Sequence, residues 1–287
     1  RSGYDPQAMI EVVKVLKNQE VFARDQALKR GQAVPQSSYH GVFDSHPDND
    51  QRLQQVLGPA RALVAGQQEV NREQFLQHLE GLPFGDSAGT GVRRGRQFYH
   101  ADLGFTLAAP VGWELLNRPD ALIAHTPDQQ VFMAMTVEAA DAGLTPEQLL
   151  RRKVGGQRLV QEQALQQEGL QGYTGIIPGS AAKRVAVIYF DSRAYLFVGA
   201  VKGRAALESQ DAKMLAMISS FRPLSAAQLQ LAQPQRLHLL QAKPGQNMAG
   251  LARDSKWPED PELNLRLLNG LYPSGEPRPG DWLKILR

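Results

Sequence analysis

A glycine-rich stretch at residues 81–95 divides the chain into two parts with different hydrophobic patterns. Its members are Gly81, Pro83, Gly85, Ser87, Gly89, Gly91 and Gly95. Because Gly and Pro interrupt helices and strands alike, the stretch predicts a loop between domains. Before it, apolar residues recur at helical spacing; after it, they alternate as in strands. The 287 residues suffice for about two or three domains.

The part before the glycine-rich stretch predicts helices. Asp5 followed by Pro6 is typical of a capped helix start, and the apolar spacing predicts a helix over 6–22. A second helix is expected to begin at Asp48, and a third to cover 70–79. This helical piece, residues 1–85, has little apolar surface for a core of its own. We expect it to complete a larger helical domain.

Residues 97–223 predict an α+β domain, an antiparallel sheet flanked by two helices. Val131, Met133, Met135 and Val137 alternate as in a strand. Further strands are expected at 105–107, 173–177, 184–190 and 194–201, the last two joined by a hairpin turn at 191–193. One helix is expected to begin at Thr145-Pro146, and a closing helix to cover 209–221.

Residues 235–287 predict a small βααβ module. A strand from Leu237 ends in a Pro-Gly turn, after which Asn247 is expected to cap a helix at 248–253. A second helix at 261–268 and a final strand at 282–286 complete the module. The fold class expected for the whole chain is multidomain α+β: a helical segment, an antiparallel-sheet sandwich and this module.

Composition narrows the classes of function. The chain has no cysteine, which excludes a disulfide framework, a thiol nucleophile and a cysteine-based zinc site. Its net charge of +3 does not favour nucleic-acid binding. No run approaches the ~20 apolar residues needed to span a bilayer. Arg93, Arg94 and Arg96 are expected to be solvated linker, with contact to an anionic membrane or glycan as the alternative.

Two short motifs connect the first segment to a known family. Gly3-Tyr4-Asp5-Pro6, and Ser45-His46-Pro47 with Arg52 downstream, resemble the part of a gluzincin zinc metallopeptidase that follows its zinc-binding helix. The family is peptidase family M forty-eight, which contains the CAAX prenyl proteases, HtpX and the mitochondrial Oma-type proteases. The resemblance implies a zinc-dependent metalloendopeptidase, in which zinc polarises the scissile carbonyl and activates water.

The zinc site that this resemblance implies is not in the chain. His-Glu-x-x-His puts two imidazoles on one helix face because residues four apart share it. No two of the six histidines are four apart, and none is followed by Glu; they are His40, His46, His78, His100, His125 and His238. The family's third ligand is a Glu just upstream of the GYDP turn, which lies before Arg1. We therefore expect zinc in a complete enzyme, none in this chain, and no peptide hydrolysis by this chain alone.

By the same resemblance, His46 and Arg52 are auxiliary catalytic residues of the complete enzyme. The matching His lies over the metal, where it donates to the oxyanion or occupies the open zinc position. The matching Arg pairs with a carboxylate of the metal shell and holds it in place. From the residues alone, His46-Pro47 is instead typical of a helix N-terminal turn with an exposed imidazole. A metal role for His40 is a minor alternative.

The middle domain carries a second resemblance. Phe105, Pro110, Gly112 and Trp113 resemble the opening of the Mog-one/PsbP-like sandwich, a fold used mostly for binding. Secreted bacterial members of the peptidase family often continue with a similar segment. This chain matches it at Gly95, Phe98, His100, Leu103, Gly104, Phe105, Pro110, Gly112 and Trp113. We expect His100 and Trp113 to be core and strand-edge residues rather than ligand contacts.

The last segment resembles a LysM module, which binds N-acetylglucosamine polymers such as peptidoglycan. Residues 268–270 and 279–286 fit the second half of that module. Asn247-Met248 replaces its usual Asp-Thr, and 256–261 is a longer inter-helix stretch. The resemblance implies a shallow glycan groove lined by Gln246, Asn247, Met248, Asn269 and Leu271. A degenerate, structural LysM remains the alternative.

Two hypotheses of function follow from these resemblances. The first is the non-catalytic C-terminal region of a metalloendopeptidase that acts in protein quality control of the cell envelope. Its accessory domains would position substrate or anchor the enzyme, its partners would be misfolded or membrane-associated proteins, and its location would be periplasmic or envelope-associated. The second is an envelope binding protein that holds peptidoglycan through its LysM-like module. No nucleic-acid partner is expected.

Overall fold

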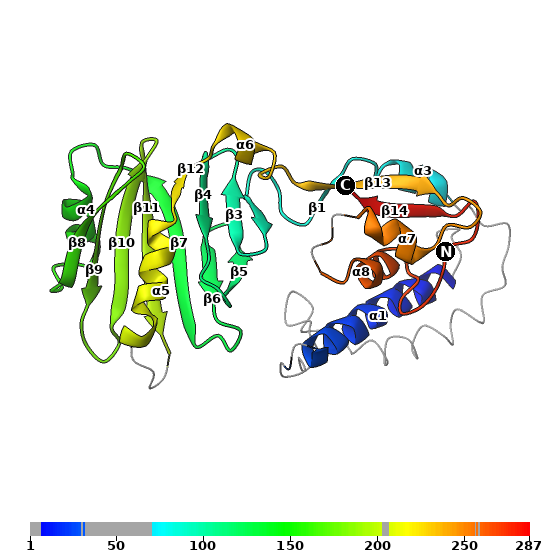
Figure 1. Ribbon diagram of the computed structural model, residues 1–287, viewed down its shortest axis with the longest axis horizontal. Coiled ribbons are helices and arrows are strands. Elements are labelled where there is room, and N and C mark those ends of the chain that lie inside the picture. The colour runs from blue at the N-terminus through cyan, green and yellow to red at the C-terminus, as the bar shows by residue number, and fades with distance from the viewer. Residues whose placement is uncertain (1–6, 30, 32–70, 203–206, 256, 258) are drawn as a thin grey trace. The chain divides into compact units, whose positions relative to one another are not determined.

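The computed structural model describes residues 7–29, 31, 71–202, 207–255, 257 and 259–287. They form two compact units (Figure 1). Unit 1 combines Arg1–Phe84 with Gln235–Arg287, and unit 2 is the continuous stretch Gly85–Pro234. The expected class, multidomain α+β with antiparallel sheets, is confirmed. The prediction had divided the residues of unit 1 between a segment at 1–85 and a module at 235–287, whereas contacts described below join them.

Unit 2 is built on a seven-stranded antiparallel sheet. In spatial order its strands are β5 (Glu114–Asn117), β6 (Leu122–His125), β7 (Val131–Ala139), β11 (Arg193–Val201), β10 (Lys183–Phe190), β9 (Leu170–Ile177) and β8 (Val160–Gln167). A four-stranded sheet lies beside it, with the order β12 (Arg222–Pro223), β4 (Phe105–Ala108), β3 (Gln97–His100) and β2 (Val92–Arg94). The unit ends in the short helix α6 (Ala226–Leu229).

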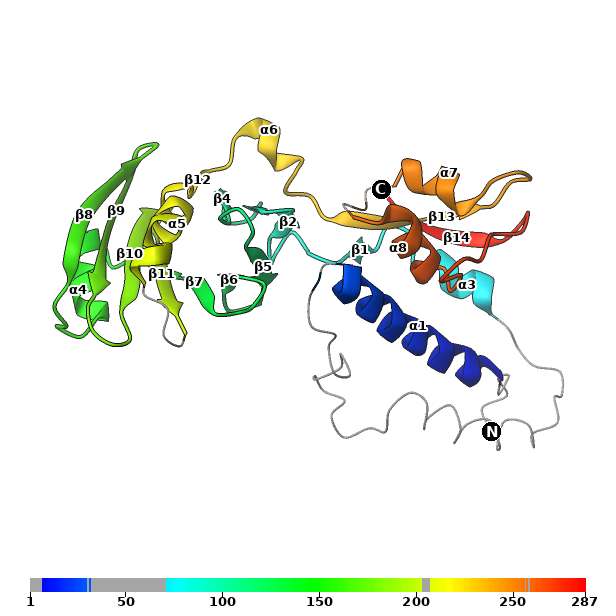
Figure 2. The same ribbon diagram turned by 60° about the horizontal axis from the view of Figure 1, so that its bottom comes forward.

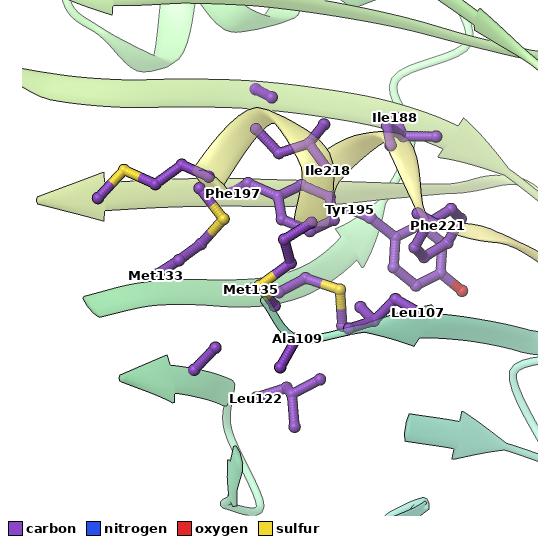
Figure 3. Close-up of a cluster of buried hydrophobic side chains, with 14 of the residues drawn as sticks. Leu107, Ala109, Leu122, Met133, Met135, Ile188, Tyr195, Phe197, Ile218 and Phe221 are labelled. Carbon is purple, nitrogen blue, oxygen red and sulfur yellow. The ribbon is translucent and has the colours of Figure 1, made fainter. Parts of the chain in front are cut away.

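The main core of unit 2 lies between the large sheet, helix α5 (Glu208–Ser219) and the small sheet. Figure 3 shows its aromatic centre, where Tyr195 and Phe221 pack ring against ring at 4.7 Å between centroids. Phe105 from β4 joins them, 5.0 Å from Tyr195. Because side chains alternate along a strand, the same strands bury a second cluster on the opposite face. There, Leu149 and Leu150 of helix α4 (Pro146–Lys153) cover Val187 of β10.

Several short sequence patterns correctly predicted the local structure of unit 2. The predicted helix start at Thr145 is a complete capping box: its hydroxyl accepts from Gln148 N, and the Gln148 side chain accepts from Thr145 N. The predicted turn between β10 and β11 is a tight hairpin, since Phe190 pairs with Arg193 and both intervening residues have positive φ. His100 and Trp113 are both buried, as expected for core residues.

The stretch predicted to be only loop contains two short strands, β1 (Pro83–Phe84) and β2. Its basic residues are not merely solvated, which corrects that prediction. Arg93 binds Asp86 and the carbonyl of Leu115. Arg94 binds the carbonyl of Gln233, which follows α6, and Arg96 binds that of Ala109, which follows β4. Gly91, at φ +87°, is required here because a Cβ would lie 2.2 Å from the Phe98 ring.

Unit 1 contains the predicted βααβ module. Strand β13 (Gln235–Gln241) leads to helices α7 (Met248–Arg253) and α8 (Pro261–Leu268), and β14 (Trp282–Leu286) returns antiparallel to β13. Both helices contribute to one small core, made by Ala242, Met248, Ala252, Leu265, Leu283 and Ile285. Strand β1 extends the sheet on the other side of β13, preceded by helix α3 (Arg72–Gln77).

Helix α1 (Gln7–Lys29) runs beside α8 in unit 1 (Figures 1 and 2). It extends beyond the predicted range of 6–22, because Gln26 and Lys29 in its last turns both bind Asp260 at the start of α8. The third predicted helix, at 70–79, is shorter in the structure, where it is α3. The helix expected to begin at Asp48 lies outside the described residues.

Candidate functional site

The two residues assigned auxiliary catalytic roles, His46 and Arg52, lie outside the described residues, as does His40. Their proximity to any carboxylate or metal is therefore an open prediction. Within the described parts of the chain, no group of three or more His, Asp or Glu side chains is arranged to hold a metal ion. The same parts contain no helix long and apolar enough to cross a membrane.

The five residues assigned to a glycan groove come from two loops of the module, at 242–247 and 269–281, and from Met248, the first residue of α7. The loops lie side by side because the ladder of β13 and β14 continues into them. The Ala242 N–H donates to the carbonyl of Asp281, and the Gly280 N–H donates to the carbonyl of Ala242. The predicted residues are thus brought into one region of the module.

A single carboxylate, that of Glu276, links the second loop to both helices. One oxygen accepts from the backbone N–H of Met248, in the first turn of α7, at 2.7 Å. The other is bound by Nη2 of Arg266 in α8, whose side chain is 8% exposed. Arg266 also binds Glu262 one turn away, at 2.8 Å. The polar centre of the module is therefore an ion network that the sequence analysis did not find.

Asn269, another predicted groove residue, connects the end of α8 to strand β14. Its Nδ2 donates to the carbonyls of Leu265 and Lys284, both at 2.9 Å, and its Oδ1 accepts from the N–H of Lys284. Every hydrogen-bonding atom of this amide has an internal partner. The Lys284 ammonium is half-buried, and that burial, followed by the charge of Arg72, lowers its pKa.

The other four predicted groove residues differ in accessibility. Met248 is fully buried in the module core, so its side chain presents no surface. Asn247 is exposed and caps α7, accepting from Gly250 N at 2.8 Å. Gln246 closes the Pro-Gly turn by accepting from Lys243 N, and Leu271 packs against the module core. The predicted groove residues whose polar side chains reach the surface, Gln246 and Asn247, are both amides, which suits binding.

The module also holds helix α1. Asp260, in the left-handed region at φ 43°, accepts from Gln26 Nε2 at 2.7 Å and Lys29 Nζ at 2.5 Å. Tyr272 donates to Asp25 at 2.8 Å and packs edge-on against Phe22. Burial, followed by the hydrogen bond to Asp25, raises the pKa of Tyr272 to about 12. These contacts give α1 a polar interface with α8 and the loop after it.

Unit 2 offers two hollows of its own. An open cleft of about 600 Å³ lies at the tip of the β10–β11 hairpin, lined by Leu144, Tyr189, Phe190 and Arg193 among others. A smaller pocket of about 90 Å³ lies between β3, β4, the β5–β6 turn and β7. His100 lines it, with its Nδ1 accepting from Leu103 N at 3.3 Å. Burial lowers the pKa of His100, opposed by Asp102 and reinforced by Arg193.

Comparisons with known proteins add fold likenesses only. No protein-family model matches the chain, and no curated protein matches it either. Matching solved structures include the PsbP protein CyanoP of Synechocystis, at 12% identity and a TM-score of 0.34, covering 49% of this chain and 99% of that one. Another is the protein Mog1, at 11% identity and a TM-score of 0.31, covering 44% and 94%. A third is a protein of unknown function from Pseudomonas aeruginosa, at 10% identity and a TM-score of 0.29, covering 42% and 92%.

PsbP and Mog1 are the proteins whose sandwich the residues around Trp113 resemble in sequence. TM-scores below 0.5 support no inference about function, and the sandwich of unit 2 is established by its own strand pairing. None of these three structures is named as a metallopeptidase or a LysM protein. Those two resemblances therefore remain proposals.

Proposed function

We propose that this chain is the non-catalytic C-terminal region of a zinc-dependent metalloendopeptidase, acting in protein quality control of the cell envelope. In this proposal unit 1 completes and supports the peptidase domain, and unit 2 is an accessory domain that positions protein substrates. The substrates would be misfolded or membrane-associated proteins, and the location would be periplasmic or envelope-associated.

One observation carries the proposal: the helix that follows the GYDP motif is bound by the βααβ module. The motif, at residues 3–6, directly precedes α1 in the sequence. Asp260 and Tyr272 of the module hold the second half of α1. A module bound in this way to a peptidase helix would be an integral support rather than a tethered binding domain, which favours the degenerate, structural alternative for the LysM-like fold.

The described residues do not fit a zinc site. They contain no suitable group of His, Asp or Glu side chains, and the sequence contains no His-Glu-x-x-His. The proposal therefore requires that zinc be held by residues of the same polypeptide upstream of Arg1. The roles proposed for His46 and Arg52 also depend on that complete protein.

The test uses the complete native protein. Zinc content and casein hydrolysis are measured for the wild type, for His46→Ala and for the control His78→Ala. We expect one zinc per chain, proteolysis that a chelator abolishes, and loss of most activity in His46→Ala alone, with its zinc and fold retained. A native protein without zinc would overturn the proposal. Full activity in His46→Ala would overturn only the role given to that residue.

The alternative function is an envelope binding protein that holds peptidoglycan. The observation that favours it is the βααβ topology with a half-buried Gln246 and an exposed Asn247 just before α7. The test is co-sedimentation with purified peptidoglycan. Gln246→Ala combined with Asn247→Ser should abolish it while keeping the helix cap, since Ser caps as well as Asn. Deleting 235–287 is unsuitable because it also removes β13, the strand that β1 pairs with, and the partners of α1.

A further inference from the structure

The pocket lined by His100 has the features of a built ligand site. Its volume is about 90 Å³, which corresponds to roughly three waters at about 30 Å³ each. Phe98, Phe105, Leu122 and Met135 form apolar walls, and all four are buried in the main core of unit 2. The pocket therefore opens from the surface into the apolar core.

Among the polar side chains that line this pocket, the imidazole of His100 is buried, and it uses only one of its two ring nitrogens in a hydrogen bond with the protein. Arg118 and Asp120 also line the pocket, but both are exposed and pair with each other at 3.6 Å. His100 is 8% exposed, and its ring stacks on Phe105 with 5.6 Å between centroids. Because Nδ1 accepts the N–H of Leu103, the neutral ring carries its proton on Nε2. In the part of the chain that the structure describes, Nε2 has no hydrogen-bond partner. His100 as a residue is nine-tenths buried, but its Nε2 is not among the fully buried unpaired atoms, so this donor is open to an acceptor atom of a ligand in the pocket.

A second unpaired polar group lies close by in the register of the sheet. Tyr195 pairs with Val137, which lines the pocket, so both side chains are on the same face of the sheet. The hydroxyl of Tyr195 is fully buried and lacks a partner among the described residues. This end of the core thus contains more hydrogen-bonding capacity than the protein itself uses.

We propose that this pocket binds a small apolar group that carries one hydrogen-bond acceptor, with Nε2 of His100 as the donor. The apolar walls bury the aliphatic or aromatic part, and the neutral imidazole selects a carbonyl or hydroxyl oxygen. A cation is disfavoured because it offers no acceptor to His100, would lose hydration against the apolar walls, and meets a carboxylate, that of Asp120, which is already paired with Arg118. This site is independent of the proposed metallopeptidase function and lies wholly in unit 2.

The mouth of the pocket allows a conservative test. Val137 lines the pocket and is 43% exposed, so a larger side chain there fills the opening without disturbing the core. Val198, on the neighbouring strand β11, is 39% exposed. It lies an odd number of residues from Tyr195 and so faces the opposite side of the sheet. Val137→Phe and Val198→Phe are therefore the same substitution at matched exposure, with only the first at the pocket.

The experiment is a titration of the full chain with cyclopentanone, followed by backbone amide and histidine ring nitrogen resonances. A saturable change centred on Leu122, Met135 and Val137, with a Kd of about 1 mM, is expected for a ligand of this size. The Nε2 resonance of His100 should move with the same Kd. Val137→Phe should weaken binding at least about tenfold, and Val198→Phe should leave it unchanged.

Cyclopentylammonium, which has the same ring but no acceptor, is the matched ligand. It is expected not to bind. Equal binding of ketone and ammonium, or an unmoved Nε2 resonance, would overturn the role of His100. Shifts that do not saturate, that centre elsewhere, or that persist in Val137→Phe would overturn the site itself.

Discussion

Arg184 of β10 donates two hydrogen bonds to Asp211 of α5, at 2.7 and 2.5 Å, while its side chain is only 2% exposed. This fork-to-fork pair holds α5 against the sheet that α5 covers. Because Arg stays charged when buried, removing its partner leaves an unpaired buried charge, which destabilises the folded state strongly.

We therefore predict that Asp211→Ala destabilises unit 2 by about 3–5 kcal/mol, as measured by urea denaturation. The control is Glu147→Ala, which removes an exposed pair with Arg151 on α4 and should leave unfolding unchanged. A loss below about 1 kcal/mol for Asp211→Ala would mean that the Arg184 charge finds water or another partner.

Glu276→Ala should destabilise unit 1 by about 1–2 kcal/mol, because it removes the partner of the Met248 N–H and one of the two carboxylates on Arg266. Hydrogen exchange should be fastest in the first turn of α7. Glu262→Ala removes only the other carboxylate and should cost less than half as much. Equal losses in the two variants would contradict the linking role of Glu276.

Asp260→Asn should loosen the second half of α1, since the amide tolerates the left-handed backbone but loses the charge that Lys29 binds. We expect amide exchange over residues 20–29 to rise about two- to fivefold at low salt. The rise should be smaller in 0.5 M salt, where the Debye length is only about 4 Å and the ion pair is screened. Glu11→Gln breaks an ion pair within α1 and serves as the control. If both variants exchange alike, α1 is not held by the module.

Tyr195→Phe should raise the stability of unit 2 by about 1 kcal/mol, because it removes a buried hydroxyl that lacks a partner among the described residues. Tyr189→Phe is the matched comparison. Its hydroxyl donates to the Leu144 carbonyl at 3.1 Å, so its loss should lower stability by a similar amount. A destabilised Tyr195→Phe would indicate that a water satisfies the hydroxyl.

The stability of unit 2 should fall as the pH drops below 6.5. Burial lowers the pKa of His100 from that value, Asp102 acts against the shift, and Arg193 adds to it. The unfolded chain therefore takes up a proton first as the pH falls, which favours unfolding. His100→Gln does not titrate and should flatten the pH dependence of unfolding between pH 6.5 and 5. If the slope of stability against pH is unchanged in His100→Gln, other titrating groups cause the pH dependence.

Signals that act over a few residues predicted much of this fold. The Thr145 capping box, the β10–β11 turn and the Asn247 cap all depend on neighbours in sequence, and all were found. The alternation at Val131–Val137 correctly predicted β7. Strand β8 was missed because its sequence, VQEQALQQ, is polar and forms a strand only by pairing with β9 at the sheet edge.

The candidate site depends on contacts that join distant residues, which no local pattern predicts. Asn269 and Asn247 bind the backbone of the module itself, and their place in a glycan groove stays a prediction. Glu276 was not found, since no local pattern shows that its carboxylate meets α7 and Arg266. Arg266 on an otherwise leucine-rich helix was the one signal available. The roles of His46 and Arg52 remain predictions.

The last residue pair of β1 and β13 joins Phe84 to Gln235, the residues on either side of unit 2. Unit 2 is thus an insertion between two adjacent strands of unit 1, and a ribosome finishes it before making any residue of β13 or β14. At a synthesis rate of about 5–20 residues per second, α1 and α3 are made several seconds before the strands and helices that they pack against. Unit 2 can already fold in that time. During synthesis, the earlier half of unit 1 is the part that needs protection from aggregation.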